Sequence, residues 1–166
     1  PPRFQEPPVF YEGLAAVIGA ANEWVYIDRM GREVLTTPND TVWAGSFHDG
    51  VTWFAVNVPQ RPGEPFDNVF NSAGRRYGLM TVAGNVLIEP TYRQVSRFSE
   101  GLAAVSVDSE IPYNDTTEPM HSGFEHQAEG KWGYCDTTGR VVIPPMFNRV
   151  GRFCEGMARA RQEGKW

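Results

Sequence analysis

The chain has 166 residues, of which 41% are hydrophobic and 13% aromatic, so it is long enough to bury the core of a single domain. Its 20 acidic and 15 basic residues give a net charge of −5, and the absence of a basic stripe argues against nucleic-acid binding. No segment approaches the roughly 20 apolar residues of a membrane span. The 17 glycines and 13 prolines indicate short strands joined by tight turns.

A short pattern recurs along the chain. Phe10 opens F-Y-E-G-L-A-A-V, Phe98 opens F-S-E-G-L-A-A-V, and Phe153 opens F-C-E-G-M-A-R-A, while Phe47 opens a weaker copy, F-H-D-G-V-T-W-F. Three of these phenylalanines follow another aromatic residue by six positions, and these residues are Phe4, Tyr92 and Phe147. Periodicity on this length scale is typical of stacked repeats.

Between these phenylalanines lies a second pattern, at residues 24–31, 77–84 and 132–139. It begins with Trp or Tyr, ends with Gly, and is followed by apolar β-formers such as Val141–Ile143. The last residues, 164–166, repeat residues 130–132, and the first four match the end of a copy. We therefore expect residues 1–166 to form a single repeat array that is a fragment of a longer protein.

The third copy shows what each repeat predicts. Residues 102–107, 131–135 and 140–143 are expected strands, and Asp136–Gly139 is an expected turn, with Asp bonded to its own downstream backbone and Gly at positive φ. Pro144-Pro145 is expected to stop the last strand.

The apolar spacing of three at Phe147, Val150 and Phe153, repeated at residues 92, 95 and 98, predicts one 3₁₀-like turn per repeat.

The recurring Glu-Gly pairs start at Glu12, Glu100 and Glu155. A catalytic carboxylate would be singular, whereas this one returns in each well-preserved copy. We expect a structural carboxylate that accepts backbone N–H bonds in a turn whose next residue must be Gly.

Two insertions, about 58–73 and 108–128, fall between the same two predicted strands and are expected to emerge on one face. The first is too rich in proline for regular structure. The second is acidic and favours a solvated loop. It also holds His121, Glu125 and His126, whose residue types suit a metal site, but their spacing matches no motif. We expect no metal site and no cofactor.

The two cysteines are expected to be free thiols, because Cys135 takes an inward strand position and Cys154 a variable one. A disulfide between them is the alternative.

The residues Trp132-Gly133-Tyr134, Asp136–Gly139, Val141–Pro145 and Phe153–Ala158 resemble the WG repeat, also called the KWG repeat. The resemblance implies about three tandem copies plus partial copies at both ends. The second copy departs from the pattern at Tyr77 and Thr81. The family is mostly bacterial, shares no enzymatic activity and is associated with binding and envelope roles, so the resemblance implies an envelope or secreted location.

We expect an all-β fold of tandem antiparallel β-hairpin repeats, stacked as an open, twisted array, with barrel-like closure as the alternative. One hairpin is marginal alone, so its apolar face must be covered by a neighbour. Equivalent aromatic residues should then be buried, namely Trp24, Tyr77 and Trp132, together with Phe10, Phe98 and Phe153.

The sequence contains no recognisable catalytic motif, and we expect no enzymatic activity and no catalytic residues. The leading hypothesis is a non-catalytic scaffold for protein–protein interaction that presents the inserted loops. The alternative is a carbohydrate or cell-wall binding module, suggested by aromatic residues outside the repeat pattern: Trp43, Trp53, Phe54 and Tyr113.

Overall fold

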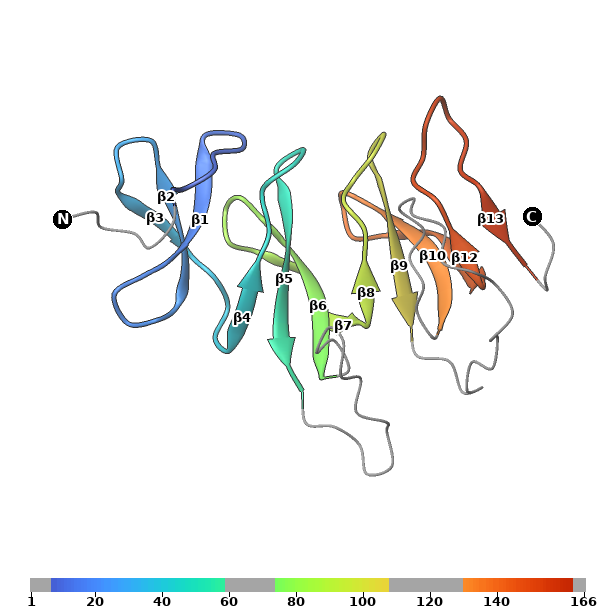
Figure 1. The fold of residues 1–166 in the computed structure, drawn as a ribbon, viewed down its shortest axis with the longest axis horizontal. Coiled ribbons are helices and arrows are strands. Elements are labelled where there is room, and N and C mark those ends of the chain that lie inside the picture. The colour runs from blue at the N-terminus through green and yellow to red at the C-terminus, as the bar shows by residue number, and fades with distance from the viewer. Residues whose placement is uncertain (1–6, 59–73, 108–129, 163–166) are drawn as a thin grey trace. The chain divides into compact units, whose positions relative to one another are not determined.

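The computed structural model describes residues 7–58, 74–107 and 130–162. The regular elements in these ranges are all β-strands (Figure 1). The chain divides into two compact parts, the N-terminal unit (Pro1–Thr91) and the C-terminal unit (Tyr92–Trp166). None of the described residues forms a helix with the length and apolarity that a membrane crossing requires. The predicted all-β class is confirmed.

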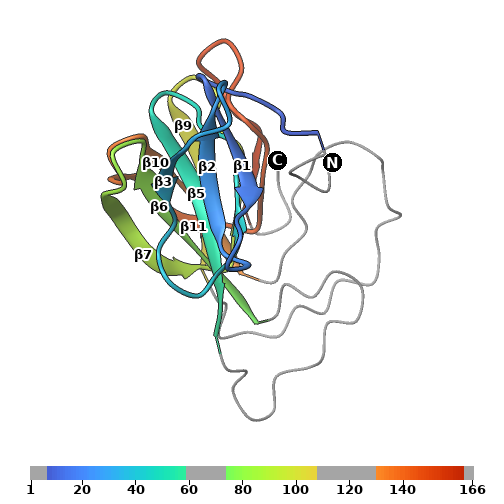
Figure 2. The same cartoon turned by 90° about the vertical axis from the view of Figure 1, so that its left-hand side faces the viewer.

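The N-terminal unit contains two antiparallel sheets. The first has the order β1-β2-β3, and Figure 2 shows its strands side by side. Its strands are β1 (Leu14–Ile18), β2 (Trp24–Asp28) and β3 (Glu33–Thr36). The second has the order β4-β5-β6-β7. Its strands are β4 (Thr41–Ala44), β5 (Val51–Asn57), β6 (Arg75–Thr81) and β7 (Val86–Tyr92).

The C-terminal unit repeats this plan in a sheet with the order β11-β10-β9-β8 and a strand pair, β12-β13. The sheet contains β8 (Gln94–Val95), β9 (Leu102–Val107), β10 (Lys131–Asp136) and β11 (Val141–Phe147). The pair contains β12 (Arg149–Val150) and β13 (Ala160–Arg161). The strand orders are open, and no described sheet closes into a barrel, so the predicted open array of hairpin repeats is confirmed.

The predicted turn at Asp136–Gly139 is confirmed. Oδ1 of Asp136 accepts hydrogen bonds from the backbone N–H of Thr138 (3.0 Å) and Arg140 (3.1 Å), and Gly139 has a φ of 85°. In the second copy the Thr81 hydroxyl replaces the carboxylate and accepts from the Asn85 N–H at 3.1 Å. The hairpin therefore closes with either acceptor.

The prediction that Pro144-Pro145 ends the strand is wrong. β11 continues through both prolines to Phe147, just as β7 continues through Pro90. β11 lies at one end of its sheet order, where a missing N–H is tolerated because no further strand needs the proton. The ladder is also bulged here, because Trp132 pairs with Phe147 and Tyr134 already pairs with Ile143.

Gly133 lies opposite this bulge, and its lack of a side chain is what allows the close approach of β11. A Cβ at this position would collide with the carbonyl oxygen of Ile143 and would lie 2.7 Å from backbone atoms of both prolines. Gly78 has the same role in the second copy, where a Cβ would lie 2.6 Å from the Ile88 carbonyl oxygen. In these two copies the Gly is thus required by backbone packing, whereas the first copy has Val25 at this position.

The predicted 3₁₀-like turns are also wrong. Val150 lies in β12, which pairs with β13, and Val95 lies in β8, which pairs with β9. The backbone groups of these short segments are satisfied by a neighbouring strand, so no helical turn is needed to pair them.

The core confirms part of the predicted aromatic set. Trp132 is fully buried, with 0% exposure, in a cluster with Tyr134 and Val150. Trp24 and Tyr77 are only half-buried, contrary to the prediction of equivalent burial. Phe10, Phe98 and Phe153 are likewise half-buried, and Phe10 and Phe153 pack against core clusters of their units.

Candidate functional site

Four equivalent two-residue turns mark the starts of successive repeats. Two reciprocal backbone hydrogen bonds close each of them, between Tyr11 and Leu14, His48 and Val51, Ser99 and Leu102, and Cys154 and Met157. Both central residues have positive φ, for example 50° at Glu12 and 83° at Gly13. This is the type I′ hairpin turn, which matches the twist of the strands and strongly favours Gly at its second central position.

The carboxylate of one such turn holds the next turn within each unit. In the N-terminal unit, Glu12 accepts hydrogen bonds from the backbone N–H of Asp49 (2.6 Å) and Gly50 (3.0 Å). In the C-terminal unit, Glu100 accepts the equivalent pair from Glu155 (2.7 Å) and Gly156 (2.9 Å). We call this arrangement the turn clamp.

The turn clamp shows Glu12 and Glu100 as acceptors of backbone N–H bonds, as predicted, whereas Glu155 contributes its backbone N–H as a donor. The donors belong to the following repeat, 37 and 55 residues away, which was not predicted. The signal for this was the recurrence of an acidic residue before Gly even in the weak copy, at Asp49-Gly50.

A buried tyrosine makes a second connection between repeats. The Tyr26 hydroxyl donates to the carbonyl oxygen of Gly45 at 2.8 Å, and its ring centroid lies 4.7 Å from that of Phe47. In the C-terminal unit, Tyr134 donates to the Gly151 carbonyl at 2.6 Å and packs against Phe153 at 4.9 Å. Burial raises the pKa of both tyrosines to about 12.

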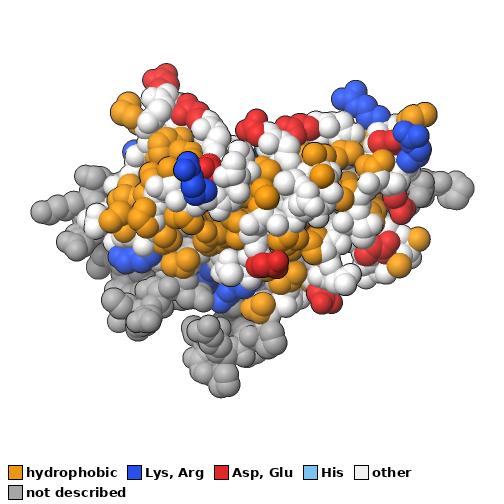
Figure 3. All heavy atoms as spheres, turned by 180° about the vertical axis from the view of Figure 1, so that it is seen from behind, with side chains coloured by type: hydrophobic (Ala, Val, Ile, Leu, Met, Phe, Trp, Pro, Cys, Tyr) orange, Lys and Arg blue, Asp and Glu red, His pale blue; other side chains and the backbone are white. Residues whose placement is uncertain are grey.

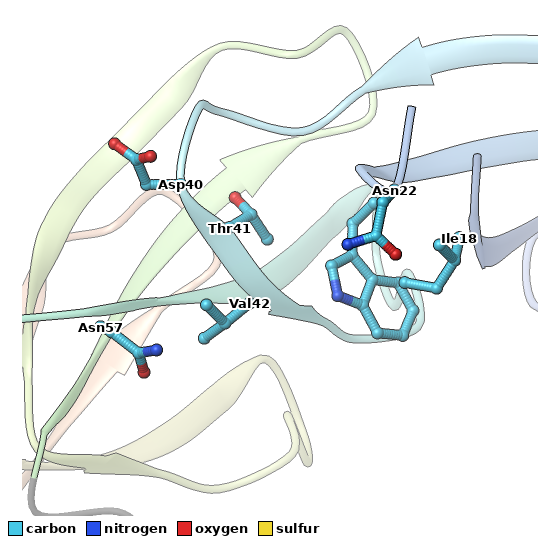
Figure 4. A pocket seen from close by; sticks show the side chains of 7 residues that line it. Ile18, Asn22, Asp40, Thr41, Val42 and Asn57 are labelled. Atoms are coloured by element: carbon cyan, nitrogen blue, oxygen red, sulfur yellow. The ribbon is translucent and has the colours of Figure 1, made fainter. Parts of the chain in front are cut away.

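Between the two sheets of the N-terminal unit lies a surface hollow of about 660 Å³, which we call the Trp24 hollow (Figure 4). Its lining residues are Ile18, Asn22, Trp24, Asp40, Thr41, Val42 and Asn57. Figure 4 shows Ile18 and Asn22 on one side and Asp40, Thr41, Val42 and Asn57 on the other. None of these residues was predicted to bind a ligand, and Trp24 was predicted to be a buried core residue.

The Trp24 hollow combines an aromatic side chain with polar side chains around it. The half-buried indole offers a face or an edge, and Asn22 and Asn57 carry amides that donate and accept hydrogen bonds. Asp40 supplies the one charge among the lining residues. No group of three or more His, Cys, Asp or Glu side chains suited to a metal ion occurs among residues 7–58, 74–107 and 130–162.

The aromatic residues that suggested a carbohydrate site differ in their burial. Trp53 and Phe54 are buried, with 6% and 1% exposure, so they are core residues and not exposed platforms. Trp43 is exposed and makes an edge contact with Tyr77 at 5.9 Å. Tyr113 lies outside the described residues.

Residues His121, Glu125 and His126, and the insertions about 58–73 and 108–128, also lie outside the described ranges, apart from Val58. Both cysteines are free thiols, as expected: Cys135 is buried and Cys154 exposed. Burial, and then the neighbouring Asp136 carboxylate, raises the pKa of Cys135 to about 12, which leaves it an unreactive thiol at neutral pH.

Comparison with known families decides the identity of the repeat. The family described as "WG containing repeat" matches residues 77–110 and 132–166. The chain carries WG repeats. The first copy lies outside the matched segments, yet it has the same type I′ turn, turn clamp and tyrosine contact as the WG repeat in the C-terminal unit. Searches among curated proteins and among solved structures find no match.

Proposed function

We propose that this WG-repeat chain is a non-catalytic scaffold for protein–protein interaction that presents its two insertions to a partner. The observation that carries the proposal is that both insertions leave the scaffold from paired strand ends. Asn57 pairs with Arg75, and the Val58 N–H donates to the Gly74 carbonyl at 2.6 Å. At the second insertion, Val107 pairs with Lys131.

Anchored ends support a binding role because a loop held at both ends loses less conformational entropy when a partner orders it. The turn clamp supports it further, since hydrogen bonds between successive repeats hold the hairpins in one arrangement within each unit. Function in repeat proteins is commonly carried by loops on such a frame.

The test replaces Asp108–Ala128 with a Gly-Ser linker of equal length and compares the partners captured by the two chains. We expect at least one partner to be lost tenfold or more, with the thermal unfolding midpoint of the chain unchanged. Met30→Gln is the matched control, because Met30 is 78% exposed in the β2–β3 turn. If every partner is captured equally well, loop presentation is wrong.

The alternative, carbohydrate binding, draws support from the Trp24 hollow. A hollow that offers an indole together with the amides of Asn22 and Asn57 suits a sugar, which can stack on the ring and hydrogen-bond to the amides through its hydroxyls. A glycan array probed at high protein concentration distinguishes the two functions. Hits that disappear in Trp24→Ala would favour the sugar, and an array without hits would favour the protein scaffold.

A further inference from the structure

The Trp24 hollow occupies a place that is filled in the C-terminal unit. There, Phe147 pairs with Trp132 across the β10–β11 ladder and packs against the cluster that contains Trp132. Phe147 lies six residues before Phe153, and the residue six before Phe47 is Thr41. None of residues 36–41, which run from the end of β3 to the start of β4, is aromatic. The weak copy therefore lacks the aromatic residue that fills this position in the C-terminal unit.

The strand register supports the equivalence of Thr41 and Phe147. Ala44 pairs with Phe54, ten residues on, and Trp43 pairs with Ala55, twelve residues on. In the C-terminal unit, Val150 pairs with Ala160 and Arg149 with Arg161, at the same separations.

The contacts after these pairs agree with that alignment. Gly45 and Gly151 each accept a tyrosine hydroxyl, from Tyr26 and Tyr134 respectively. Residues 43–50 and 149–156 thus align without a gap, and counting back two residues from Trp43 and Arg149 reaches Thr41 and Phe147. The β4–β5 ladder shifts register between Thr41 and Trp43, and the backbone partner of Trp24 is Thr37, so Thr41 corresponds to Phe147 by its position in the repeat and not by ladder pairing.

The loss of the aromatic residue changes the exposure of the tryptophan. Trp132 is 0% exposed beside Phe147, whereas Trp24 is half-buried and lines the hollow. The Thr41 side chain does not replace the ring, because its hydroxyl donates to the Pro38 carbonyl at 2.6 Å in the local turn. An indole edge is thereby left beside a space that a benzyl group occupies in the equivalent repeat.

Resting on the proposed scaffold function, we propose that the Trp24 hollow binds an aromatic side chain of a partner polypeptide, in the position that Phe147 takes against Trp132. Aromatic pairs favour edge-to-face or offset contacts, which the half-buried indole offers. The amides of Asn22 and Asn57 can bond the backbone of an extended peptide. Asp40 favours a segment with a basic residue close to the aromatic one.

The chain itself supplies the probe. A synthetic peptide with the sequence of Pro144–Arg149 carries the natural plug, Phe147, and a basic residue two positions later. It is titrated into ¹⁵N-labelled full chain, and the indole N–H signal of Trp24, assigned by its loss in Trp24→Phe, reports binding. We expect this signal to shift, and a peptide with Phe147→Ala to bind at least tenfold more weakly.

The matched variant is Thr41→Phe, which restores the aromatic residue in cis. We expect it to weaken the peptide at least tenfold, because the hollow is then filled. Binding to the C-terminal unit by displacement of β11 would survive this substitution, so equal affinity for both chains overturns the proposal. A Trp24 shift with cello- or chito-oligosaccharides and none with the peptide overturns it as well.

A second variant keeps the test decisive if Thr41→Phe does not fold. Asp40→Asn retains a residue that tolerates the positive φ of 63° at this position. We expect it to weaken the peptide about threefold and to leave a peptide with Arg149→Ala unaffected. No effect on either peptide overturns the assigned position of the basic residue. The loop-replacement experiment leaves the hollow intact, so the two tests are independent. If the peptide does not bind at the hollow but a partner is still lost when the loop is replaced, this inference is wrong and the scaffold function stands.

Discussion

The N-terminal and C-terminal units use the same parts and differ in how one tryptophan is covered. Both have the type I′ turns, the turn clamp and the tyrosine that reaches the next repeat. In the C-terminal unit Phe147 covers Trp132, while in the N-terminal unit Thr41 leaves Trp24 beside a hollow. A repeat can therefore lack this core aromatic residue and keep its connection to the next repeat, because the turn clamp and the tyrosine hold that connection independently.

The largest expected effect concerns the two tryptophans whose burial differs between the units. Trp132→Ala should lower the free energy of unfolding by about 3–5 kcal/mol, since it empties a fully buried site, whereas Trp24→Ala should cost about 1–2 kcal/mol. Urea denaturation of the full chain, followed by circular dichroism, measures both. Equal costs would show that the exposure difference between the two indoles has no energetic consequence.

Gly133 gives the next largest effect. Gly133→Ala should cost about 1–3 kcal/mol, because the new Cβ meets backbone atoms of β11 that cannot rotate away. Gly151→Ala is the control in the same unit, since its Cβ would lie 3.8 Å from the nearest atom. The same denaturation experiment compares them, and a neutral Gly133→Ala would contradict the role of the bulge.

The turn clamp should contribute less. Glu100→Ala removes two hydrogen bonds that water can partly replace, so we expect a loss of about 1 kcal/mol. Glu155→Ala is the matched control, because Glu155 has the same positive φ and its carboxylate makes no hydrogen bond to any described residue. Thermal unfolding of the two variants decides, and a larger loss in Glu155→Ala would contradict the clamp.

The last expected effect is a pH dependence that both units share and that appears only in alkaline solution. Burial raises the pKa of Tyr26 from 10.0 to about 12, so the unfolded chain loses this proton first as the pH rises. Stability should therefore be unaffected below pH 10 and fall between pH 10 and about 12. Tyr26→Phe should reduce that slope, as should Tyr134→Phe in the other unit. Unfolding curves recorded from pH 8 to pH 12 test this, and unchanged slopes would contradict the assignment.

Local patterns predicted the fold well because they depend on neighbours in the chain. The Asp136–Gly139 turn, the strands on either side and the repeated Glu-Gly turns were all predictable from short-range hydrogen bonding and from the φ preferences of glycine. The predictions were wrong where the local conformation depends on which strand lies beside the segment. Pro144 was expected to end a strand, but it lies in the bulged outer strand β11, and sequence spacing alone does not tell an outer strand from a central one.

The candidate site was the least predictable part. The aromatic residues that stand out in the sequence, Trp53 and Phe54, are buried, while the lining of the Trp24 hollow comes from three separate stretches of chain. The sequence shows Thr41 where the C-terminal unit has Phe147. Only the structure shows that this difference leaves Trp24 beside a hollow.

The sequence by itself determined that this protein is all-β and carries WG repeats, because hairpin turns and strand alternation are local and are repeated several times. Only the tertiary structure decided that Glu12 and Glu100 bond to the following repeat, and that Trp24 is left half-covered where Trp132 is buried. The physical reason is that burial and long-range hydrogen bonds depend on which segments meet, and one missing ring changes that outcome without changing the repeat.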